Sequence, residues 1–411
     1  MKLNLKTWIA TSNSFLIASI FFAPLIQNFG LISNLKYLFF GLNVMFIVTY
    51  LFQNNLKLDL PKFKIQALIF LSVFFLLFSI VSIFHYNGNP SYVINYILLL
   101  TIFVSLAIIN NCNRAMKLFS NLTIFLLIIY LSLAAFNLFN FLITKTLIFD
   151  FYSFKYYRLN KIFRLGMGLE DPNFLSMKIL IGFFLSYFVV KNKVMTNILL
   201  FFMFLSLSVA FLGIIFIFYL FFHYKKIFKF KYIFFISLLL FGFFYLVFSN
   251  ELLFDILSRK FIDAGSSTGE SSLMVSIEAR LEQYIIGIKV LFENIFGIGA
   301  ENFVNVATEY CIQNGYLEAL NMQGTFHDFH NSLFQILICG GIITFIIFVF
   351  FCMSVYKNLK TYQLKTFFFL FLISSATINA SNVLQFWLMF LLFLFIPFSY
   401  QFQKRIITYE K

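Results

Sequence analysis

The sequence predicts an all-α polytopic membrane protein with about 12 transmembrane helices and a large outer loop between helices 9 and 10. Of its 411 residues, 61% are hydrophobic and 11% are charged, whereas charged residues make up about 25% of an ordinary soluble domain. Apolar runs long enough to span a bilayer, about 20 residues, recur along the chain. The basic residues sort to one side of these runs, as they do in membrane proteins.

The apolar runs begin directly behind Lys2 and Lys6. The first run could mimic a signal peptide, but it lacks a small-residue cleavage site and more runs follow, so we predict that it stays as a helix. We expect spans at about 8–26, 34–52, 65–85, 92–110, 118–141, 174–190, two between 194 and 223, then 232–249, 331–356, 366–383 and 384–402.

The segment 194–223 is long for one span and short for two. With the N-terminus inside the cell, two short helices place 19 of the 30 basic residues on the inner side, whereas a single helix would move every later group outside. We therefore predict a hairpin turn near 206–209 and both termini in the cytoplasm. The chain then divides into spans 1–9 within 1–249, an outer loop at 250–330, and spans 10–12 with a tail at 331–411.

Acidic residues sort the opposite way, since 14 of the 16 fall in two outer segments and none lies inside a span. Lys178 is the one clear charge within a helix, and we expect it to extend its side chain to the nearby outer end. The net charge of +14 thus belongs to membrane loops, and no nucleic-acid partner is predicted. The four cysteines have no paired spacing and indicate neither a disulfide framework nor a zinc site.

The first outer loop, 142–173, is basic on the side where basic residues are rare. Either an anionic ligand such as a diphosphate or anionic lipid head groups would explain this. At its end, Asp171 and Asn173 are candidates for substrate binding or for capping the sixth helix, with Pro172 at the first helical position. Its basic residues are Lys145, Lys155, Arg158, Lys161 and Arg164.

The second outer loop contains apolar residues at helical spacing over 276–296, with Ser276 as a plausible N-cap and Gly297 as a stop. This pattern predicts an amphipathic helix that lies on the outer membrane surface or packs on the spans. Arg280 falls in its first turn, where the helix dipole opposes a cation. A ligand anion or a salt bridge to a loop acid would offset that cost.

His327 and His330 stand just before the tenth span. Histidine titrates near neutral pH, which suits a general base. With Asp328 the pair could form at most a weak metal site, because no distant further ligand is evident. The alternative is that these histidines anchor a helix end at the membrane interface.

In order along the chain, these motifs give a likeness to a known family. The chain resembles the O-antigen polymerase and O-antigen ligase family of Gram-negative bacteria, which shares the span count, a late periplasmic loop, an Arg at the start of an amphipathic loop helix and a His-Asn pair entering the next span. The matching pieces are Arg164-Leu-Gly, Asp171-Pro-Asn173, Ser276–Tyr284, Phe296–Phe303 and His330-Asn331 followed by Gly341.

The resemblance implies glycosyl transfer from an undecaprenyl-diphosphate-linked glycan at the periplasmic face of the inner membrane. It implies catalytic roles for Arg280, with the diphosphate, and for His330 as base with His327 in reserve. It implies substrate binding by Arg164, Arg158, Asn331, Asp171 and Asn173. We expect no metal and no cofactor, a lipid bilayer around the protein, and a possible chain-length regulator in the same membrane.

Within the family the sequence favours a polymerase, which joins lipid-linked repeat units, over a ligase, which transfers the glycan to lipid A–core. The family often has an Arg in the turn between helices 7 and 8, and here 206–210 has none; a second departure is Thr344, where a Gly is common. A transporter or flippase is the competing class, but ion-coupled transporters usually bury acids at mid-membrane. A structural membrane subunit leaves the histidines and the basic loop unexplained.

Overall fold

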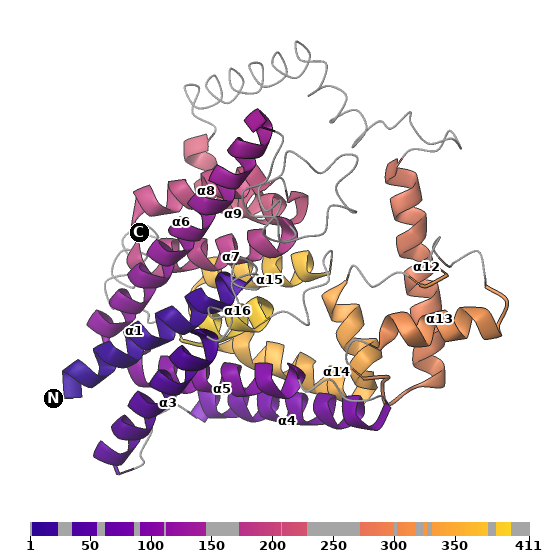
Figure 1. Ribbon diagram of the computed structural model, residues 1–411, viewed down its shortest axis with the longest axis horizontal. Coiled ribbons are helices and arrows are strands. Elements are labelled where there is room, and N and C mark those ends of the chain that lie inside the picture. Colours follow the sequence, from indigo (N-terminus) through magenta and orange to yellow (C-terminus); the bar gives the residue numbers. More distant parts are fainter. Residues whose placement is uncertain are drawn as a thin grey trace.

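The computed structural model describes residues 2–23, 35–55, 62–85, 91–110, 112–144, 172–206, 208–227, 272–299, 302–316, 320, 324–326, 331–376 and 384–395. Within these ranges every regular element is a helix (Figure 1). The expected all-helical architecture is therefore confirmed for this part of the chain. The span expected at 232–249 and the start of the large loop lie outside the described residues.

The N-terminal helices follow the predicted apolar runs closely. The last of them extends beyond its predicted run at both ends, whereas the first begins earlier and ends earlier than its run. The helices are α1 (Lys2–Phe21), α3 (Leu35–Gln53), α4 (Lys62–His85), α5 (Ser91–Asn110) and α6 (Asn113–Thr144).

The middle of the chain resolves the ambiguous segment 194–223 into two helices, α8 (Lys193–Ser206) and α9 (Val209–Ile227), with the break where the turn is predicted. Before them, α7 (Pro172–Phe184) begins at the predicted proline and continues as the π-helical segment η3 (Leu185–Val190). Two helices in this segment are what the predicted topology requires.

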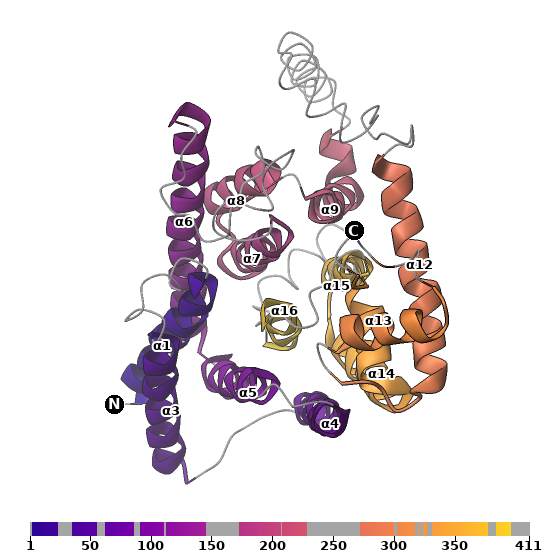
Figure 2. The same cartoon turned by 45° about the vertical axis from the view of Figure 1, so that its right-hand side comes forward.

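The C-terminal part contains α12 (Ser272–Glu293), α13 (Phe303–Gln313), α14 (Ser332–Asn358), α15 (Tyr362–Ser375) and α16 (Leu384–Phe395). Among the described residues, five helices are long and apolar enough to cross a membrane, and α14 is one of them. In Figures 1 and 2, α12 runs across the direction of α4 and α14 at one end of these two helices.

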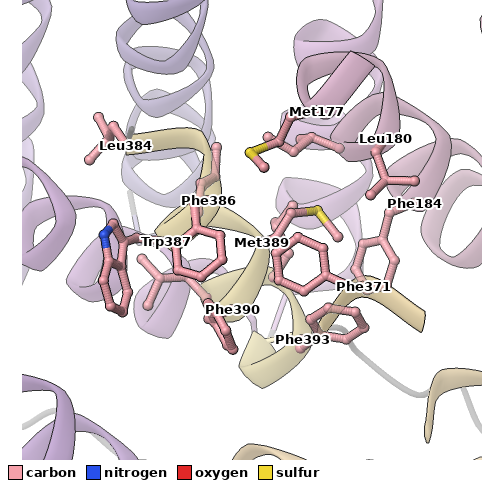
Figure 3. Close-up of a cluster of buried hydrophobic side chains, with 14 of the residues drawn as sticks. Met177, Leu180, Phe184, Phe371, Leu384, Phe386, Trp387, Met389, Phe390 and Phe393 are labelled. Carbon is pink, nitrogen blue, oxygen red and sulfur yellow. The ribbon is translucent and has the colours of Figure 1, made fainter. Parts of the chain in front are cut away.

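The core is centred on α16, all of whose residues are buried. Its Phe390 ring packs edge-to-face on Phe371, 5.4 Å between centroids, and Phe393 packs on Phe184 of α7, 4.8 Å between centroids (Figure 3). Such interdigitated rings hold helices together in a bilayer, where the lipid tails remove the usual hydrophobic driving force. The Phe-rich composition thus supplies the packing of the bundle.

Lys178 corrects one prediction. Its side chain does not reach the outer end of its helix but is 0% exposed. The ammonium donates to the carbonyl of Phe21 at 2.7 Å and lies 4.6 Å from the ring centroid of Tyr130. A nearby helix end thus supplies the acceptor, so the cation is solvated by protein groups and joins α7 to α1 and α6.

Candidate functional site

The candidate site is built on α12 and on the start of α14. Helix α12 begins at Ser272, four residues before the predicted start, so Ser276 lies inside the helix and is not its cap. It ends at Glu293, and Gly297 follows with φ +97°, a conformation that L side chains rarely adopt. A helix therefore lies in the region where one is predicted, with its boundaries shifted toward the N-terminus.

The turn after α12 is bonded through its backbone to a break in α14. The amide of Ile298 donates to Ile338, at 3.3 Å, and the amide of Gly299 donates to Cys339, at 2.9 Å. In return the Ile342 amide donates to the carbonyl of Ile295 at 3.0 Å. These three bonds pair two carbonyl groups and one amide group of α14 at the point where the helix is interrupted, which lowers the cost of the break.

Both segments that meet here, the turn after α12 and the break in α14, need glycine. We call Gly297, Gly299 and Gly341 the glycine junction. Gly341 has φ 77° and ψ 172° and interrupts α14. A Cβ on Gly297 would lie 2.5 Å from the Cys339 carbonyl oxygen, and one on Gly299 would lie 2.9 Å from the Cα of Ser82 in α4. The junction therefore packs three backbones together and fixes where α12 leaves the membrane-spanning helices.

A second connection joins α12 to the N-terminus of α14. The Asn331 side-chain oxygen accepts hydrogen bonds from the amides of Leu333 and Phe334, both at 3.0 Å, which caps α14. The Asn331 amide donates to the Tyr284 hydroxyl at 2.9 Å, and the rings of Tyr284 and Phe334 meet edge-to-face at 5.0 Å.

This connection brings together two segments that the sequence singled out separately. Arg280 precedes Tyr284 by four residues, about one helical turn, and its backbone lies in α12. His330 directly precedes Asn331 in the chain. The Asn331–Tyr284 bond therefore joins the helix whose backbone includes Arg280 to the residue that follows His330 in the chain.

The other predicted site residues are placed as follows. Asn173, the second residue of α7, accepts a hydrogen bond from the Ser208 hydroxyl at 2.9 Å, so it fastens the α8–α9 turn rather than standing at an N-cap. The neighbouring Ser176 and Ser206 hydroxyls lie 2.7 Å apart. The remaining predicted site residues lie outside the described residues: Arg158, Arg164, Asp171, His327 and His330.

Helix α12 makes a polar contact with the segment after α13 that the sequence did not predict. Lys289 donates to the Tyr316 hydroxyl at 2.8 Å and lies over its ring, 4.1 Å from the centroid. That hydrogen bond raises the pKa of Lys289, so the lysine stays cationic. Burial raises the pKa of the neighbouring Cys311 thiol, so it stays protonated and is no candidate nucleophile.

The spacing of Tyr284 behind Arg280 is the sequence feature that could have identified this tyrosine as a site residue. The two positive-φ glycines before α13 could not be recognised from composition alone. In the part of the chain that the structure describes, no three metal-ligating side chains come together. His327, Asp328 and His330 lie outside the described residues.

A comparison with known families places this region. Residues 194–349 match a family model described as O-antigen ligase. The matched segment contains α8, α9, α12, α13 and the start of α14 through its break, and therefore the glycine junction, Arg280 and Asn331. No curated protein and no solved structure gives a significant match to the chain.

Proposed function

We propose that this protein, whose residues 194–349 match a family model described as O-antigen ligase, is an O-antigen polymerase. It would join oligosaccharide repeat units carried on undecaprenyl diphosphate at the periplasmic face of the inner membrane. The observation that carries the proposal is the contact between α12 and the start of α14 within the matched segment, made by Tyr284 and Asn331.

In the proposed reaction a sugar hydroxyl of the acceptor attacks the anomeric carbon of the donor. The bond from that carbon to the diphosphate oxygen breaks, and its electron pair leaves with undecaprenyl diphosphate. His330 accepts the hydroxyl proton, with His327 as the alternative base. Arg280 binds the departing diphosphate, because its planar guanidinium matches two phosphate oxygens at once.

The arrangement of Asn331 supports this assignment. Its side-chain oxygen is used by the helix cap, and one of its two amide hydrogens is used by Tyr284. The second amide hydrogen points to a role in binding a substrate oxygen beside the base. Asn331 would thus both orient the chain at His330 and contact the glycan.

Arg164 and Arg158 are proposed to supply further positive charge to the lipid-linked substrates from the first outer loop. Asp171 would contact the substrate from the end of that loop, and Asn173 from the second position of α7. The bond from Ser208 to Asn173 supports the view that this loop is tied to the α8–α9 turn. The diphosphate is a good leaving group, so we expect no metal to be needed, and a chain-length regulator is a candidate partner in the same membrane.

Ligation to lipid A–core is the second candidate, because the matching family model is described by that activity. The polymerase is preferred because the α8–α9 turn lacks the arginine that the family often has there, and polymerase sequences diverge more than ligase sequences. Ser206 and Ser208 stand at this turn and bond to α7. Donor, carrier and membrane face would be the same for both reactions, and only the acceptor differs.

Deletion of the gene separates the two activities through the lipopolysaccharide profile. Loss of a polymerase leaves the ligase free to attach single units, so we expect core plus one repeat unit and no ladder. Bare core together with polymer on the carrier lipid would identify a ligase. An unchanged ladder would contradict both and would favour a transporter or a structural role.

A further inference from the structure

Helix α12 has a buried side that protein covers and an apolar side that protein leaves exposed. Gln283, Ile286 and Val290 are buried against the rest of the fold. A second set, which we term the outer row, is exposed: Leu281, Ile285, Ile288 and Phe292, with Phe292 reaching 76%. The predicted apolar stripe therefore does not form the packing face of this helix.

The two sets lie on opposite sides of α12. Residues of an α-helix are spaced by about 100° around its axis, which puts the outer row in one arc and the buried set in the arc facing it. Glu282, Lys289 and Glu293 fall between them on one flank. The helix thus presents one side to protein, one flank of charged groups and one wholly apolar side.

The outer row is continuous with a surface that faces lipid. It runs into Ile295 and Phe296, which are also exposed, and Ile295 is bonded through its carbonyl to the amide of Ile342 in α14. Helix α14 is a candidate membrane span. Its exposed apolar side chains continue from that point as Ile342, Ile343, Ile346, Val349, Phe350 and Met353.

The orientation of α12 fits the same surface. The helix runs across the direction of α4 and α14 at one end of them (Figures 1 and 2), as expected for a helix in the plane of the interface. Exposed apolar patches of this kind on a soluble surface are unusual. An interfacial helix is stable in this geometry because its apolar side enters the acyl region while its charged flank stays in water.

We infer that the outer row of α12 is inserted into the hydrocarbon of the outer leaflet and anchors the large periplasmic loop to the bilayer surface. The occupant of this surface is bulk lipid, because the row is continuous with the lipid-facing side of a span and contains no charge. The inference goes beyond the proposed function and holds for either reaction. It places the start of α12, and hence Arg280, at head-group depth.

Spin-label accessibility tests this depth. The background is the full-length protein with Cys112→Ser, in which the remaining native cysteines are buried. Single cysteines replace Ile285 or Phe292 in the outer row. Cysteines at Glu282 or Glu293, on the charged flank, are the matched controls. The labelled proteins are reconstituted in phosphatidylethanolamine–phosphatidylglycerol liposomes without polyprenyl lipid. Collisions with oxygen and with the water-soluble nickel complex NiEDDA are then measured.

We expect oxygen to relax the outer-row labels several-fold more strongly than NiEDDA does, and the reverse order at Glu282 and Glu293. Strong NiEDDA relaxation at the outer row would overturn the inference. If neither oxygen nor NiEDDA relaxes the outer-row labels and their spectra show spin–spin broadening, a second copy of the chain covers the outer row. That result would also overturn the inference. Phe292→Trp gives an independent readout, since brominated acyl chains should quench the added tryptophan above the Trp8 and Trp387 background.

Discussion

The hydrogen bond from Asn331 to Tyr284 is the smallest feature on which the proposed site depends. It joins residues 47 positions apart in the chain and lies one helical turn from Arg280 and one residue from His330. A neutral hydrogen bond of this kind contributes about 1 kcal/mol. Its importance is therefore one of position more than of stability.

Tyr284→Phe should lower the polymerisation rate roughly fivefold while leaving the protein folded, because about 1 kcal/mol of orientation is lost. The ring contact with Phe334 would remain. Tyr316→Phe is the matched control, since it removes the hydrogen bond to Lys289 on the other flank of α12. Equal losses in both variants, measured by turnover of lipid-linked repeat units, would argue against a positioning role for Tyr284.

Arg280→Lys should fail nearly as badly as Arg280→Ala, because neither side chain makes the two-pronged contact with a diphosphate. Loss of such a contact removes about 2–4 kcal/mol of transition-state stabilisation, roughly 30- to 1000-fold in rate. Lys289→Ala on the same helix controls for a general loss of positive charge. Activity close to wild type in Arg280→Lys, at equal membrane levels, would mean that only a charge is needed at this position.

At the scale of elements, the glycine junction decides how α12 and α14 meet. Three backbone hydrogen bonds cross it, and Gly297, Gly299 and Gly341 all have positive φ. The backbones approach so closely that no side chain fits between them. The amphipathic helix carrying Arg280 is thus rigidly connected to the span that His330 precedes.

Gly297→Ala and Gly341→Ala should each destabilise the protein strongly, because the left-handed conformation costs about 1–2 kcal/mol for an L residue and the added Cβ meets backbone atoms. Melting temperature in detergent and activity should fall together. Gly213→Ala in α9 has open space and should be neutral or slightly stabilising.

Gly315→Ala separates the two causes of that destabilisation, because its φ is positive while nothing lies within 4 Å of the added Cβ. An intermediate loss of stability is expected there. If Gly341→Ala melts at the wild-type temperature, the junction is not the rigid connection described here.

The elements also mark the limit of what the sequence could predict. The span boundaries and the helix break at 206–209 followed from hydropathy and charge, which are local properties. The buried side of α12 could not be predicted in this way, because Gln283, Ile286 and Val290 are buried only through tertiary contacts. The burial of Lys178 was missed for the same reason, since its acceptor comes from a different helix.

For the whole molecule, the two outer loops must lie on one side of the membrane if they share a substrate. The separate helices α8 and α9 keep the two loops on the same side in the predicted topology. Single cysteines at Ser153 and Ser267 should therefore both react with an impermeant thiol reagent in intact cells whose outer membrane is permeabilised.

Native Cys112, at the start of α6, is expected on the inner side and should stay unlabelled until the inner membrane is opened. Labelling at only one of the two loop positions would mean that the loops lie on opposite faces. A shared site built from both loops would then be impossible.

Polymerisation by the purified protein in liposomes tests the central claim most directly. The substrate is a single repeat unit on undecaprenyl diphosphate, without lipid A–core, and the measurement compares product lengths for the wild type and His330→Ala. We predict carrier-linked oligomers and released undecaprenyl diphosphate from the wild type, and neither from His330→Ala at an unchanged melting temperature. Oligomers of equal length from His330→Ala, or none from the wild type until lipid A–core is added, would contradict the account.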